Sequence, residues 1–130
     1  MAPKKVIFVA GNPLVAADSL ALQVAEQLEG KIRGIEFVAI DSLDELQEKE
    51  KQNLCIMDVA FGIKKVELIE SVEKLFTKQP VSSHDFDLAI QLKVLQKMGK
   101  IGKVRIIAIP ANCNLGKAVK EVKRLLELPE

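Results

Sequence analysis

The chain has 130 residues, 48% of them apolar and 28% charged, and this predicts one domain, residues 1–130, with a substantial core. A net charge of +1 and a near absence of aromatic residues (five Phe, no Trp, no Tyr) argue against nucleic acid as a partner. No stretch approaches the roughly 18–20 consecutive apolar residues that a membrane span needs, so no membrane association is expected.

In the first half of the chain, short apolar runs alternate with helical patterns. Residues 4–10 (KKVIFVA) predict a strand, and residues 15–29 place apolar side chains at helical spacing before a glycine stop. Residues 34–40 (GIEFVAI) predict a second strand, and 41–52 a helix with acidic residues in its first turn. The continuous apolar run over 53–59 (NLCIMDV) has the length of a buried strand.

The second half begins with an irregular stretch, residues 61–80, whose pattern fits a helix or an edge strand; its β-branched early part favours the strand. Residues 83–98 give the clearest helix, and 103–109 (KVRIIAI) and 116–128 predict a last strand and an amphipathic helix. The residues of the clearest helix that recur every three or four positions are Phe86, Leu88, Ala89, Leu92, Leu95 and Met98.

The resulting order, β-α-β-α-β-(β)-α-β-α, predicts an α/β fold. Apolar strands that alternate with helices are typical of a mostly parallel twisted sheet with helices on both faces, a single three-layer domain. The two cysteines, Cys55 and Cys113, match no zinc-binding spacing. Cys55 lies in an apolar run and is expected to be a buried small hydrophobe, and the lack of a disulfide framework fits the cytoplasm.

Three polar residues stand where such a sheet binds ligands, beyond the carboxyl ends of its strands. Asp18 comes after the first strand, Asp58 near the end of the third, and His84 at the start of the clearest helix. Asp18 and His84 each fit a structural role as well, in a first helical turn. Asp58 is harder to explain that way, because a charge in a buried strand costs free energy unless it is paired or used.

The neighbours of His84 define where its helix begins. Ser82 and Asp85 have the spacing of a capping box, with Asp in place of Glu or Gln. One imidazole and two carboxylates suit a divalent ion such as Ni²⁺, Zn²⁺ or Fe²⁺, with a position left open for water or substrate. A nucleophilic triad is disfavoured, since the chain has one histidine and no G-x-S-x-G elbow. The GNP loop has neither of the glycine patterns of phosphate-binding loops.

Together, the segments VIFVAGNPLVAADSLALQVAEQL, LCIMDVAFG and SSHDFDLAIQL, in this order, resemble the hydrogenase maturation proteases. These endopeptidases remove a C-terminal extension from the large subunit of [NiFe] hydrogenases. The resemblance implies that Asp18, Asp58 and His84 are both the metal-binding and the catalytic residues. It also implies a nickel ion supplied by the large-subunit precursor, for which another divalent metal can substitute. The residues expected to contact the substrate are Gly11, Asn12 and Ser83.

The sequence departs from the family pattern at three places, and two other functions stay open. Ala17 replaces the first acid of the loop pair, SLA (19–21) replaces the GVG that follows the pair, and IKKVELIESVEKL replaces a Pro-Gly segment. A non-catalytic relative that binds a metal or a maturation partner would tolerate these changes. A receiver-like module phosphorylated on Asp58 fits the strand-end position. Against it, Asn12 and Pro13 stand where an acidic pair is expected, and the last strand is followed by no lysine.

Overall fold

The computed structural model describes residues 5–10, 19–40, 53–60, 63–71, 83–99 and 101–127, with the side chains of 83–89 outside this description. The helix predicted over 41–52 lies outside the described residues.

A five-stranded sheet forms the middle layer, and its strand order is β2-β1-β3-β5-β4. The strands are β1 Lys5–Ala10, β2 Ile35–Ile40, β3 Leu54–Ala60, β4 Glu67–Ile69 and β5 Val104–Pro110. Neighbouring strands run parallel except at the edge, where β4 pairs antiparallel with β5. The prediction of a mostly parallel sheet is confirmed.

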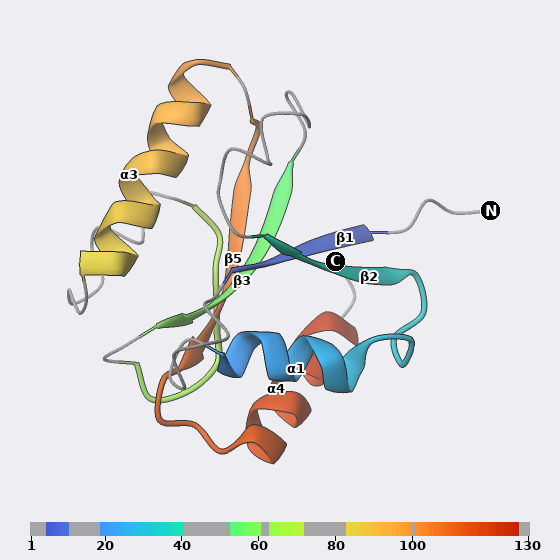
Figure 1. Cartoon of the computed structure of the whole chain (residues 1–130). Helices are drawn as coiled ribbons and strands as arrows, with labels where there is room; N and C mark the ends of the chain where they lie inside the picture. Colours follow the sequence, from blue (N-terminus) through green and yellow to red (C-terminus); the bar gives the residue numbers. More distant parts are fainter. Residues whose placement is uncertain are drawn as a thin grey trace.

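Helices cover both faces of this sheet, so the predicted three layers are confirmed (Figure 1). The helices are α1 Leu20–Leu28, α3 Ser83–Lys97 and α4 Leu115–Glu127. Helices α1 and α4 pack on one face and α3 on the other. No helix in the described ranges is both long and apolar enough to cross a bilayer.

The period of two along each strand distributes the core between these faces. In β3, Cys55 and Met57 point into the core under α1 and α4, while Ile56 points toward α3. Cys55 is buried, as predicted, with 6% of its surface exposed. Because β3 and β5 are covered on both faces, they read as continuous apolar runs in the sequence.

Local sequence signals explain where α1 ends and where α4 begins. Gly30, with φ of +77°, follows the last turn of α1, and that left-handed conformation is the usual helix stop. The Oδ1 atom of Asn114 accepts the backbone N–H of Lys117 at 3.3 Å and so caps α4. The predicted first turn of α1, at residues 15–18, lies outside the described residues.

The irregular stretch contributes β4, so its predicted early strand is confirmed. The backbone N–H of Val66, just before β4, donates to Oε2 of Glu121 on α4 at 3.2 Å.

In α3, Leu92 and Leu95 are buried against the sheet, as their spacing predicted. Met98 instead is 62% exposed, because it follows the last residue of α3 on the side of the exposed Ile90 and Val94.

Candidate functional site

The strand order changes direction beside β1, and this point positions the candidate site. The chain leaves β1 toward β2 on one side and later returns to β3 on the other. The carboxyl ends of β1 and β3 therefore flank a topological switch point, where open α/β sheets bind their ligands. Both helices that lead out of this region, α1 and α3, begin on the side of the sheet where β3 ends (Figure 1).

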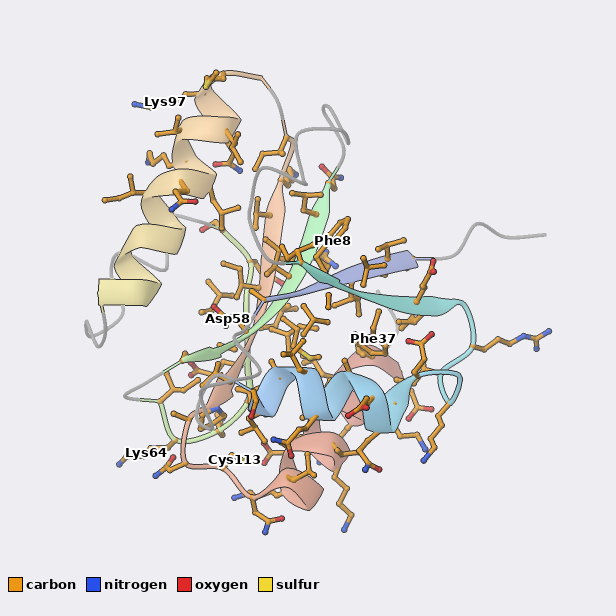
Figure 2. The ribbon with its side chains drawn as sticks, in the orientation of Figure 1. Phe8, Phe37, Asp58, Lys64, Lys97 and Cys113 are labelled. Atoms are coloured by element: carbon orange, nitrogen blue, oxygen red, sulfur yellow. The ribbon has the colours of Figure 1, made fainter. Side chains whose placement is uncertain are left out.

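Asp58 lies at this switch point, near the carboxyl end of β3, and is 4% exposed. It belongs to the same face of the strand as Leu54 and Ile56, the face that α3 covers. Figure 2 shows Asp58 at the sheet, on the side where α3 begins. A carboxylate so deeply buried costs free energy unless hydrogen bonds or a cation compensate it.

The hydrogen bond that holds Asp58 is explained by the register of the sheet. Its Oδ1 accepts the backbone N–H of Val59 at 2.8 Å. The backbone N–H of Leu54 and the backbone carbonyl of Ala60 form hydrogen bonds on the β5 side of β3. Because successive residues of a strand direct their backbone groups to opposite sides, the N–H of Val59 points to the β1 side. The pairing of β1 with β3 ends at Val9 and Met57, two residues before Val59. The carboxylate thus takes the place of a strand partner where β1 and β3 separate.

The segment that carries Asp18 follows β1, whose last residue is Ala10. The register of β1 and β3 ends at Val9 and Met57, so Ala10 and Asp58 are each one residue beyond the last pair. Asp18 directly precedes Ser19, whose carbonyl oxygen accepts the N–H of Gln23 at 2.9 Å in the first turn of α1. Asp18, like the predicted loop residues Gly11 and Asn12, falls in 11–18, outside the described residues.

His84 is the second residue of α3, so its prediction at a helix start is confirmed for the backbone. The helix begins at Ser83, at the sheet edge where β3 ends. The side chains of Ser83, His84 and Asp85 lie outside the description, as does Ser82, so the predicted cap stays a prediction.

The fold places Asp58 and the start of α3, which carries His84, at one edge of the sheet, and of the three predicted ligands only Asp58 has a described side chain. Within the described part of the chain, no three His, Cys, Asp or Glu side chains gather closely enough to hold a metal. Because Asp18 and the side chain of His84 lie outside the described residues, the metal site stays a prediction. Its donor set, two carboxylates and an imidazole, still suits a divalent ion with an open position.

Neither thiol has the properties of an activated nucleophile. Burial raises the pKa of Cys55 above the usual range of a thiol. Burial, with the Glu121 carboxylate as a second cause, also raises the pKa of Cys113. A nucleophilic cysteine needs a lowered pKa, so cysteine chemistry is disfavoured at both positions.

No family profile matches the sequence, and no curated protein matches it. Several solved structures are similar to the chain. The chain superposes on the hydrogenase 3 maturation protease with a TM-score of 0.65 and 18% identity, over 97% of this chain and 90% of the other. For the maturating endopeptidase HybD from E. coli the values are 0.64 and 15%, over 94% and 91%. For the [NiFe] hydrogenase maturation protease HybD from Thermococcus kodakarensis they are 0.61 and 18%, over 93% and 98%.

The chain has the fold of the hydrogenase maturation proteases. This confirms the fold that the sequence resemblance implied, over more than nine-tenths of the chain. The segment IKKVELIESVEKL, which departs from the pattern of the maturation proteases, contributes β4 to the sheet edge. The departure is therefore compatible with the maturation protease fold.

The structure also has a feature that the sequence analysis did not predict, a groove between α1 and β2. Its sequence signal is weak, because α1 reads as an ordinary amphipathic helix and β2 as an ordinary strand.

Proposed function

We propose that the protein is an endopeptidase that removes the C-terminal extension from the nickel-loaded large-subunit precursor of an [NiFe] hydrogenase. The proposal rests on one observation above all: a buried aspartate is anchored at the switch point of a sheet with the maturation protease fold. The segment with Asp18 begins and α3 starts at the same edge. We place the reaction in the cytoplasm.

In this proposal, Asp18, Asp58 and His84 bind the nickel ion that the precursor carries. The hydrogen bond from Val59 restrains one oxygen of Asp58 just beyond the point where β1 and β3 stop pairing. A ligand held in this way loses little conformational freedom when the metal arrives. The residues assigned to contact the peptide are Gly11, Asn12 and Ser83.

Two routes to hydrolysis follow from this ligand set. The metal can polarise the scissile carbonyl and supply a bound water. Alternatively, Asp18 or Asp58 can act as a general base toward a water molecule. In both routes the site holds the precursor through its nickel ion, so an apo precursor would be left uncut.

The decisive experiment is cleavage of a nickel-loaded and an apo large-subunit precursor, followed by the mobility shift on a denaturing gel. We expect cleavage only of the loaded precursor. Asp18→Asn, Asp58→Asn and His84→Ala should each lower its rate by about 100-fold or more while keeping the native circular dichroism. Glu127→Gln, an exposed carboxylate on α4, is the matched control and should cleave normally. Normal cleavage by all three site variants would show that the site is wrongly assigned.

The same assay separates the proposal from its alternatives. A wild-type chain that binds nickel with the precursor and leaves the peptide bond intact would be a non-catalytic relative. The receiver-like alternative is disfavoured by the strand order, because β4 is antiparallel at the edge and gives 2-1-3-5-4. Receiver-like folds have the order 2-1-3-4-5. A phosphoryl adduct on Asp58 after incubation with a small phosphodonor would reverse this judgement.

A further inference from the structure

An apolar groove of about 430 Å³ lies between α1 and the edge strand β2. Leu22 and Ala25 of α1 form one wall, and Val9, Phe37 and Ala39 of the sheet form the other. The groove opens on the face that α1 and α4 cover, opposite the face to which Asp58 belongs. It is therefore separate from the proposed peptidase site.

The groove exists because the helices do not extend under the whole sheet. Helix α1 packs on β1 and β3 and against α4, and this leaves β2 projecting beyond it. Phe37 of β2 is only partly buried and lies between its strand and α1 (Figure 2). An aromatic ring in a half-covered position offers apolar area to a ligand.

Two carboxylates stand at the rim of the groove, that of Glu26 on α1 and that of Glu29, which directly follows the last residue of α1. Both are exposed. Oε2 of Glu29 accepts the backbone N–H of Phe37 at 3.2 Å, so this carboxylate is positioned over the strand edge. The rim is thus negative over an apolar floor.

The same hydrogen bond decides how a ligand can bind. The N–H of Phe37 points away from the sheet, toward the side where an added strand would pair. Glu29 already occupies that donor, which protects the edge from strand addition at this point. A ligand would therefore be recognised by its side chains.

We propose that this groove is a second binding site, one that takes an apolar side chain of a partner polypeptide flanked by lysine or arginine. The apolar side chain would contact Ala25, Phe37 and Ala39, and the flanking cations would pair with Glu26 and Glu29. Charge complementarity excludes acidic segments, because the two exposed carboxylates at the rim would repel them. The inference does not depend on the proposed peptidase activity.

The test uses the intact chain and the probe peptide acetyl-Lys-Lys-Phe-Lys-Lys-amide, followed by amide chemical shifts at low ionic strength. We expect saturable shifts at Ala25, Phe37 and Ala39. Replacing the peptide phenylalanine by alanine should weaken binding by about tenfold or more, since a large apolar side chain is lost. Equal binding of acetyl-Glu-Glu-Phe-Glu-Glu-amide, or shifts confined to α3, would overturn the proposal.

Matched variants locate the two parts of the site. Glu26→Gln and Glu29→Gln should each weaken binding by about two- to fivefold, and the glutamine at position 29 keeps an acceptor for the N–H of Phe37. Glu36→Gln is the control, since Glu36 is also exposed on β2 and points to the opposite face of the strand. Ala39→Phe should fill the groove and abolish binding. Unchanged affinity in Ala39→Phe would show that the groove is not the site.

Discussion

Oδ1 of Asp58 and the backbone N–H of Val59 form a 2.8 Å hydrogen bond at the place where β1 stops pairing with β3. We expect Asp58→Asn to keep this acceptor and to change the free energy of unfolding by about 1 kcal/mol or less. Asp58→Ala leaves the N–H of Val59 without its acceptor and should cost about 1–3 kcal/mol. Urea unfolding of both variants measures the difference. Equal stability of the two would contradict the structural role of this bond.

Helix α3 is held by a few buried leucines, and its anchoring matters because His84 is on its first turn. Leu92→Ala removes a side chain with 0% exposure and should lower the free energy of unfolding by about 2–5 kcal/mol. The control is Val94→Ala, two residues on, where the side chain is 48% exposed. This substitution should cost about 0.5 kcal/mol or less. Similar urea midpoints for the two variants would refute the packing of α3.

The contact between Val66 and Glu121 fixes the segment before β4 to α4. We expect Glu121→Ala to release it and to speed amide hydrogen exchange at Val66 by about fivefold, because one hydrogen bond contributes about 1 kcal/mol. Glu121→Gln keeps an acceptor and should exchange close to the wild-type rate. The backbone N–H of Leu54, which donates to the carbonyl of Lys103, serves as the internal reference. Faster exchange at both amides would indicate global destabilisation instead.

The buried thiol of Cys55 predicts a loss of stability at alkaline pH. Burial raises its pKa in the folded state, so the folded protein holds the proton more tightly than the unfolded chain does. Stability from this group is complete below the unfolded pKa, near 8.5, and is lost as pH rises above it, by at most about 1.4 kcal/mol per pH unit.

Cys55→Ala removes this titration, and its stability deficit relative to the wild type should shrink between pH 7 and pH 10. Denaturant unfolding across that range measures the deficit. Cys113→Ala gives the comparison at a partly exposed thiol whose pKa is raised in the same direction. A deficit that stays constant with pH in Cys55→Ala would contradict the role assigned to burial.

The sequence predicted the layers of this fold because its strands carry a strong signal. The runs that became β3 and β5 are apolar at nearly every position, which only a sheet covered on both faces requires. The direction of β4 was beyond the sequence. The sequence of a three-residue strand does not indicate which strand it pairs with or in which direction. The pairing of Leu68 with Ile107 depends on the fold around β4.

The position of Asp58 was predictable from the sequence, and its geometry was less so. Alternation places Asp58 on the α3 face, and the strand run places it near the carboxyl edge. Its hydrogen bond to Val59 was not foreseeable, because it depends on where β1 stops pairing with β3. Helical spacing grouped Met98 with Leu92 and Leu95, yet Met98 is exposed because it follows the end of α3 on the side of Ile90 and Val94.

The position of β5 between β3 and β4 has a consequence for biosynthesis. A growing chain can pair β1, β2 and β3 early, but β3 keeps one bare, apolar edge until residues 104–110 leave the ribosome. Only then can β4 join the sheet, although it was synthesised long before. Closure of these distant contacts is slow, and the waiting edge can pair with other chains. Early release of the chain would therefore favour aggregation, and chaperones that shield strand edges would be needed most during synthesis of its second half.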